Sequence, residues 1–511
     1  MAPLLAKALL FPSTALAGLL NFQQATAPLS HPIVNSESLQ ACIDPKALQR
    51  RAEALFEIAK SSIDEYNRPT RVIGSAGHQR TLDYIYSELA NMGDYFTLSN
   101  QTFQAFTGHV TESRLIIGDS VLTNATAFSL TPPTPENEPV DGKLVLIADE
   151  GCDSSNYPSS VAKNIALIQR GTCPFSTKSE LAGKAGAVAA VIYNNQHGSL
   201  SGTLGTPLPD HVPTFGISKE EAAPFIEILK NKNMTLLATA YIDGEVRTID
   251  TYNIVAQTTQ GDANNCVMLG AHSDSVAEGP GINDDGSGTL TLLEVAQQLT
   301  KFTVKNCVRF AWWAGEEEGL LGSDYYADHL SPEENQKVRL FMDYDMLASP
   351  NFAYQVYNAT NEANPEGSEQ LRDMYTAWYK KHNIPYTLIE FDGRSDYDGF
   401  IRNGIPAGGI ATGAEGVKTK EEQQLFGGKA GDWYDPCYHQ LCDDVGNVNM
   451  TAWEVNTKLV AHSVATYALS FDGFPARNPP TVSDSVFRTK PATNKGSSGT
   501  SLLYHGPKLV M

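Results

Sequence analysis

Strand-like and helix-like segments alternate along the second half of the chain, and this alternation restricts the fold more than any other feature. The strand-like segments are continuous apolar runs, whereas the segments between them carry apolar residues at helical spacing. Strands that are apolar on both faces are typical of a parallel sheet with helices covering each side. We therefore expect a mostly parallel, mixed α/β sheet flanked by helices, with strands within 253–259, 266–274, 307–315 and 338–347 and helices within 290–302 and 320–330.

The first half of the chain and the extreme end have different patterns. Residues 41–91 carry two stretches of helical periodicity, and a strand-like pattern begins after Tyr95. Between 125 and 245, short apolar runs alternate with turn residues, and we find no cluster of catalytic side chains. This composition indicates a small β-rich insert with a structural or substrate-guiding role. Residues 476–511 are rich in proline, serine, threonine and glycine, so we expect a flexible tail.

Charge and the N-terminus restrict the partners and the compartment. The net charge of −21 argues against a nucleic-acid partner, because no basic face is available to neutralise phosphates. Residues 1–17 combine Lys7, an apolar stretch and a small-residue end, which is typical of a signal peptide. No other segment is long and apolar enough to span a membrane. We expect a secreted protein, with the vacuolar lumen as the alternative.

The cysteines and the sequons fit an oxidising compartment. Among the 7 cysteines we expect disulfides from Cys437 to Cys442, from Cys152 to Cys173 and from Cys266 to Cys307, with Cys42 unpaired. The third pair is expected because both cysteines begin apolar runs that are candidates for neighbouring strands. Asn-X-Ser/Thr sequons permit N-glycosylation at Asn100, Asn124, Asn233, Asn358 and Asn449.

The loop after the apolar run 266–270 carries the first cluster of candidate metal ligands. It contains His272, Asp274, Asp284 and Asp285 among several glycines. Imidazole and carboxylate groups are ligands that zinc accepts, and a loop that leaves a buried strand is where an open α/β sheet forms its site. The alternative is an acidic surface loop that caps the following helix.

Three further clusters follow later in the chain. Glu316, Glu317 and Glu318 follow one apolar run, where the alternative is a solvated helix N-terminus. Asp343 and Asp345 end another run, and we expect one of them to be a ligand and the other structural. Cysteines at 437 and 442 enclose Tyr438 and His439. Because the carboxyl ends of parallel strands share one edge of a sheet, we expect these clusters to converge.

These motifs together resemble a known family. The stretches HSDSVAEGPGINDDGSG, GEEEGLLGS, Asp345-Met346 and CYHQLC are similar to the di-zinc aminopeptidases of the secreted leucine aminopeptidase and vacuolar aminopeptidase Y group, and the similarity covers nearly the whole chain. The stretch that begins GCDSSNYPSSVAKNIALIQRGTCPF resembles the protease-associated domain inserted in many of these enzymes. The resemblance implies a zinc peptidase domain formed by 41–124 and 246–475, and a protease-associated domain at 125–245.

The resemblance also implies a role for each matching residue, in a site with two zinc ions per chain. Asp284 would bridge the ions, His272 and Asp345 would complete one site, and Glu317 and His439 the other. Alignment on GLLGS makes Glu316, rather than Glu318, the general base. The resemblance further implies that Asp274 orients His272, that Tyr438 polarises the carbonyl or holds the oxyanion, and that Arg394 lies near the substrate.

The activity implied is removal of N-terminal residues, such as Leu and other apolar ones, from peptides with a free N-terminus by a di-zinc-activated water. We expect a monomer. One alternative is a di-zinc carboxypeptidase, although those relatives carry a helical domain after the catalytic core, whereas little but a tail follows residue 470 here. The other is a non-catalytic, receptor-like protein on the same scaffold, against which the intact set of candidate ligands argues.

Overall fold

The computed structural model describes residues 31–231 and 234–477. The expected signal peptide at 1–17, the sequon at Asn233 and all but the first two residues of the tail expected at 476–511 lie outside this range.

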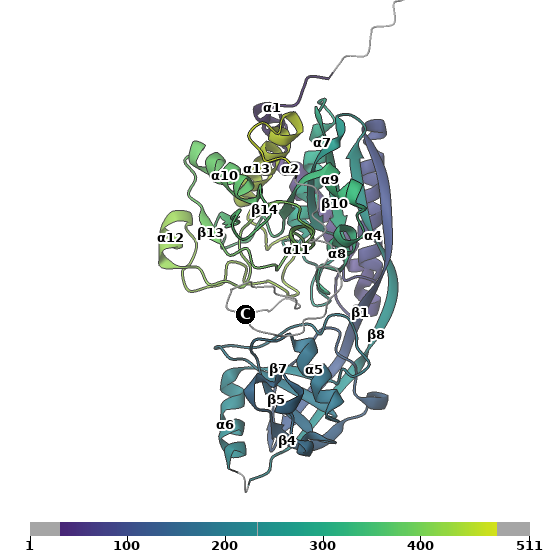
Figure 1. Cartoon of the computed structure of the whole chain (residues 1–511), viewed down its shortest axis with the longest axis vertical. Coiled ribbons are helices and arrows are strands. Elements are labelled where there is room, and N and C mark those ends of the chain that lie inside the picture. The colour runs from purple at the N-terminus through teal and green to yellow at the C-terminus, as the bar shows by residue number, and fades with distance from the viewer. Residues whose placement is uncertain (1–30, 232–233, 478–511) are drawn as a thin grey trace, which may run out of the picture.

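The core of the larger unit is a mixed sheet in which the central strands are parallel (Figure 1). The strands lie in the order β13 (Thr387–Ile389), β12 (Gln355–Tyr357), β14 (Ala407–Ala411), β11 (Val338–Tyr344), β9 (Asp262–His272), β10 (Asn306–Trp313) and β8 (Leu237–Thr258). Parallel pairs join β10 to β9, β9 to β11 and β11 to β14, whereas β8 and β12 pair antiparallel at the two sides. This arrangement confirms the expected fold class.

Alternate residues of these strands point into two cores on opposite faces of the sheet. Along β10, Val308, Phe310 and Trp312 pack in the larger core, whereas Ala311 and Trp313 pack in the smaller one. The helices that supply the larger core are α1 (Ser36–Ala41), α2 (Pro45–Ala59), α4 (Ala76–Ala90), α7 (Gly286–Leu299), α10 (Ser368–Lys381) and α13 (Met450–Leu469). The other face is covered by α8 (Leu321–Asp328) and α11 (Asp398–Arg402), with α9 (Pro332–Lys337) against β9 and β11.

The insert extends the same sheet beyond β8. Its strands follow in the order β4 (Val140–Leu146), β5 (Ile165–Gln169), β6 (Ala189–Tyr193), β7 (Thr214–Ile217) and β3 (Thr126–Ala127). The helices of the insert are α5 (Phe175–Lys184) and α6 (Lys219–Lys230), and two buried clusters form its core. It lies below the larger unit in Figure 1.

A long two-stranded ribbon connects the two units. β1 (Phe96–Ile117) pairs antiparallel with β8 over nearly its whole length, from Phe96 opposite Thr258 to Ile117 opposite Ala238. In Figure 1 these strands run along one side of both units. The junction expected at 245/246 therefore falls within a continuous strand, and Leu115, before the expected insert, packs in the core of the insert. A period-two strand pattern does not reveal which of two cores each part of the strand joins.

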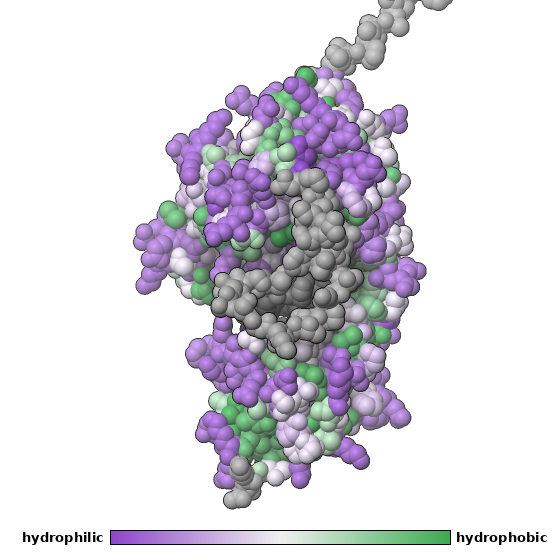
Figure 2. All heavy atoms as spheres, viewed as in Figure 1, coloured by the Kyte–Doolittle hydropathy of each residue, from purple (hydrophilic) through white to green (hydrophobic). Residues whose placement is uncertain are grey.

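Three disulfides occur in the structure, and they are the pairs that the sequence predicts: Cys152–Cys173, Cys266–Cys307 and Cys437–Cys442. Cys42 is free. Across residues 31–231 and 234–477, no helix has the length and apolar character required to cross a bilayer. On the face shown in Figure 2, hydrophilic residues cover most of the surface over α10 and α12 (Lys420–Phe426).

Candidate metal centre

The candidate ligands lie at one edge of the sheet because three neighbouring parallel strands end there. β9 ends at His272, opposite Trp313 of β10, and the register of β11 sets Asp343 opposite Gly270. The loops that follow these strands therefore begin side by side. One of them, residues 272–285, is called the ligand loop below. It ends where Asp285 caps α7, with its Oδ1 accepting a hydrogen bond from the Gly288 amide at 2.8 Å.

His272 lies at the centre of one group of carboxylates. Its Nε2 is 3.2 Å from Asp284 Oδ1, 3.8 Å from Asp345 Oδ1 and 3.9 Å from Glu316 Oε2. The imidazole is completely buried. Burial opposes a positive charge on the ring, but the carboxylates, Glu316 foremost, outweigh burial and raise the His272 pKa well above its usual value. The site therefore attracts positive charge strongly.

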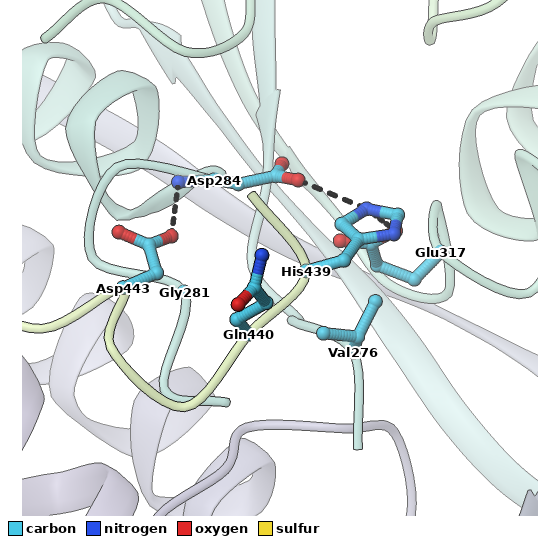
Figure 3. A pocket seen from close by; sticks show the side chains of 7 residues that line it. All are labelled: Val276, Gly281, Asp284, Glu317, His439, Gln440 and Asp443. Carbon is cyan, nitrogen blue, oxygen red and sulfur yellow. Dashed lines mark hydrogen bonds and ion pairs between the residues drawn. The ribbon is translucent and has the colours of Figure 1, made fainter. Parts of the chain in front are cut away.

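His439 forms a second group with the same aspartate. Its Nε2 lies 3.1 Å from Asp284 Oδ2 and 3.1 Å from Glu317 Oε2. Burial again opposes charge, but Glu317 and Asp284 raise the His439 pKa to about 10. The carboxylate of Asp284 thus faces one histidine with each of its oxygens, and Figure 3 shows its side chain directed toward His439.

The donor atoms are close enough and of the right type for metal ions. Three groups have ligand atoms that all lie within 4.8 Å of one another: His272–Glu316–Glu317, His272–Asp285–Asp345 and Asp284–Glu317–His439. The buried atoms Asp345 Oδ1 and His439 Nε2 face other candidate ligands of these groups, at the distances given above. Nitrogen and carboxylate donors in such groups fit zinc. Asp285 is already occupied, because its Oδ1 also accepts the Met346 amide at 3.1 Å.

Asp274 lies behind His272 and fixes the segment that carries the glutamates. Its Oδ1 is 3.6 Å from His272 Nδ1, and it accepts the Gly315 amide at 2.9 Å. Its other oxygen accepts the amide of Glu317 at 3.2 Å. Burial raises the pKa of Asp274, but His272 and these amides outweigh burial and lower it below its usual value. The carboxylate is thus ionised, and it connects two ligand-bearing loops.

The structure also separates the adjacent acids between which the sequence left a choice. Glu318 belongs to neither histidine group within the described chain, and burial raises its pKa well above the usual value. Burial and the neighbouring Asp345 raise the pKa of the fully buried Asp343 to about 7. Asp345, by contrast, faces His272. Glu316 and Asp345 thus lie near His272, whereas Glu318 and Asp343 belong to neither histidine group within the described residues.

Tyr438 and Arg394 border the site. The Tyr438 ring stacks on His439, with 3.8 Å between ring centroids. Arg394 Nη2 lies 2.7 Å from Glu415 Oε1, and burial of its guanidinium is outweighed by Glu415 and Tyr438, which raise its pKa. The Cys437–Cys442 disulfide closes the loop that carries His439, whose φ of 56° is in the left-handed region.

Several polar residues that hold the ligands were not identified from the sequence. Asp443 accepts the amides of Asn283 at 2.9 Å and of Asp284 at 3.0 Å, so that the loop of His439 holds the backbone of Asp284 (Figure 3). Ser395 donates to Asp345 Oδ2 at 3.1 Å. The only signals in the sequence are their places beside recognised motifs, Asp443 directly after Cys442 and Ser395 directly after Arg394.

Comparisons with known proteins agree with this geometry. Residues 253–464 match the model of peptidase family M28, and residues 140–225 match the PA domain. The chain is 51% identical over 457 residues to aminopeptidase Y of Saccharomyces cerevisiae, covering 87% of this chain and 82% of the relative. It is 42% identical over 446 residues to the probable leucine aminopeptidase 2 of Aspergillus fumigatus, covering 85% of this chain and 87% of the relative.

A solved structure extends the similarity to three dimensions. An aminopeptidase from Aneurinibacillus sp. strain AM-1 superposes with a TM-score of 0.69 at 26% sequence identity, covering 88% of this chain and 98% of that one. The family models, the relatives in sequence and the solved structure thus confirm the resemblance seen in the sequence. On the strength of the histidine and carboxylate groups at the sheet edge, and of relatives that match over most of their length, the chain belongs to peptidase family M28 and carries an inserted PA domain.

Proposed function

We propose that this protein is a zinc-dependent aminopeptidase with two zinc ions in one site. The observation that carries the proposal is the carboxylate of Asp284, one oxygen of which faces His272 and the other His439. The relatives named aminopeptidase and leucine aminopeptidase support the reaction. A carboxylate shared by two histidine groups is an arrangement that can hold a pair of metal ions.

Each zinc ion would have one histidine and one carboxylate of its own. His272 and Asp345 would hold one ion, Glu317 and His439 would hold the other, and Asp284 would be shared. Asp274 would orient His272 from behind, as an outer carboxylate does for a metal-bound imidazole. When bound, zinc supplies Lewis-acid chemistry, making water a better nucleophile at neutral pH and polarising a peptide carbonyl.

Glu316 is the proposed general base. Its side chain is completely buried and its Oε2 lies 3.9 Å from His272 Nε2, beside both groups of donors. In this position its carboxylate takes a proton from the attacking water and delivers it to the leaving amine. Tyr438, stacked on His439, would donate a hydrogen bond to the oxyanion, and Arg394 would contact the substrate at the rim.

The remaining proposals concern substrate, compartment and assembly. We propose that the substrates are peptides with a free N-terminus, because the acidic site favours a cationic amino group. We also propose that Leu and other apolar N-terminal residues are preferred. We also propose a secreted monomer that carries glycans. Asn100, Asn124 and Asn358 are exposed, whereas Asn449 is half-buried and caps α13, which leaves Asn449 as the weakest acceptor of the four described.

The proposal is tested with substrates that differ only at the amino group. Leu-p-nitroanilide should be hydrolysed, and N-acetyl-Leu-p-nitroanilide, with the same leaving group, should not. Asp-p-nitroanilide tests the preference for apolar residues and should be cleaved more slowly than the Leu compound. Hydrolysis of an N-blocked dipeptide with a free C-terminus would instead support a carboxypeptidase, and zinc-loaded protein without any hydrolysis would support a receptor-like role.

A further inference from the structure

An arginine far away in the sequence is buried against the ligand loop. Arg71 precedes α4 by 5 positions and is completely buried. Buried arginines require partners for their donors and their charge, because the desolvation of an unpaired guanidinium is very costly. Here those partners come almost entirely from residues 273–281, more than 200 positions further along the chain.

The guanidinium of Arg71 donates to three backbone carbonyls of this loop. Nε donates to Pro280 at 2.8 Å, Nη2 donates to Gly281 at 2.5 Å, and Nη1 donates to Ser273. One side chain thus joins the residue that follows His272 to the turn that precedes Asp284. The two ends of the loop are held together through a single planar group.

The backbone around Arg71 adds to this connection. The Arg71 amide donates to Ser275 Oγ at 2.9 Å, and Thr70 Oγ1 donates to the Val276 carbonyl at 2.7 Å. At Gly281, whose φ is +61°, an added Cβ would lie 2.2 Å from the Asp284 carbonyl oxygen and 3.0 Å from Arg71 Nη2. The loop is therefore closely packed around the guanidinium.

The charge of Arg71 is also matched to the site. Four buried aspartates interact electrostatically with its guanidinium: Asp274, Asp285, Asp443 and Asp284. Without a cation among them, these carboxylates would repel one another and drive the loop apart. Arg71 therefore supplies a fixed positive charge that acts on these aspartates, while its guanidinium donates to backbone carbonyls of the loop.

We propose that Arg71 is a positioning residue that holds the ligand loop in its metal-binding conformation before zinc binds. This inference rests on the proposed function. It follows from the geometry, because the loop ends joined by Arg71 carry His272 and Asp274 on one side and Asp284 on the other. Lysine cannot replace it, because an ammonium group lacks the planar set of donors that reaches three carbonyls at once.

The test compares Arg71→Lys with Arg51→Lys as a matched control. Arg51 is also a largely buried arginine, its side chain 11% exposed, but it pairs with Glu294 and Glu88 instead of the ligand loop. Zinc affinity is measured by chelator competition on metal-free protein, stability by urea unfolding, and kcat and KM at saturating zinc. We expect Arg71→Lys to weaken zinc binding by about 10- to 100-fold with KM nearly unchanged, and Arg51→Lys to leave zinc affinity within about 3-fold.

Equal zinc affinity in Arg71→Lys and wild type would overturn the inference and leave Arg71 a purely structural residue. If Arg71→Lys does not fold, Ser275→Ala, which removes one hydrogen bond to the Arg71 amide, replaces it, with a smaller loss of zinc affinity expected and an unchanged affinity again decisive. Wild-type protein that binds no zinc would refute the proposed function instead, so the two failures are distinguishable.

Discussion

Replacing Glu316 by glutamine separates proton transfer from metal binding. Glutamine keeps the shape of the side chain in its completely buried site but cannot accept a proton at neutral pH. Glu318→Gln is the matched control, because Glu318 is also buried and only two residues away but belongs to neither histidine group in the described chain. Both variants remove one carboxylate from the same segment.

The expected loss follows from the role of the residue. A positioned general base contributes about 10²- to 10⁴-fold to the rate, which is about 3 to 5 kcal/mol at about 1.36 kcal/mol per factor of ten. The histidines, Asp284, Asp345 and Glu317 remain in Glu316→Gln, so zinc content should stay the same. Activity should therefore fall by at least about 100-fold without loss of metal.

The assay is kcat on Leu-p-nitroanilide together with zinc content, measured on wild type and both variants. Glu318→Gln should keep kcat within about 5-fold of wild type, since Glu318 belongs to neither histidine group within the described residues. Glu316→Gln protein that retains more than a tenth of the activity would refute the reasoning. So would a loss in Glu318→Gln as large as that in Glu316→Gln.

Three other perturbations test the surrounding structure. Burial lowers the pKa of His462 to about 4, whereas the same histidine in the unfolded chain takes up a proton below about pH 6.5. The free energy of unfolding should therefore decrease as the pH is lowered from about 6.5 to about 4. In urea unfolding at pH 4 compared with pH 7, His462→Gln should recover about 3 kcal/mol of that loss. Equal acid sensitivity of both proteins would contradict this. Ser395→Ala removes the hydrogen bond to Asp345 and should weaken zinc binding about 10-fold by chelator competition, with an unchanged affinity as the contrary result. Leu293→Ala opens a cavity at a completely buried position of α7 and should cost about 3 kcal/mol by urea unfolding, whereas a cost below about 1 kcal/mol would show that the core closes around it.

Local patterns were sufficient to predict the strands and to mark the candidate ligands, because both are encoded in short stretches. Continuous apolar runs predicted β9, β10 and β11, and the acids directly after them lie together because parallel strands end at one edge. The motif resemblance then selected Asp345 over Asp343 and Glu316 over Glu318. Spacing alone could not do so, since adjacent carboxylates differ only in which way the loop turns them.

What holds the ligands could not be predicted, because it depends on contacts between distant segments. Arg71 and the Gly281 carbonyl that it binds are 210 positions apart in the chain, and Asp443 is 159 positions from the Asp284 amide. The continuous β1–β8 ribbon was not foreseen for a similar reason. Its alternating pattern is the same on both sides of the junction between the two units.

Zinc titration into metal-free protein tests the central claim most directly. If Asp284 serves two ions, metal analysis of the saturated protein should give two zinc ions per chain, and hydrolysis of Leu-p-nitroanilide should reach its maximum at that ratio. Full activity with one bound zinc ion per chain, or with none, would contradict a site built around a shared carboxylate.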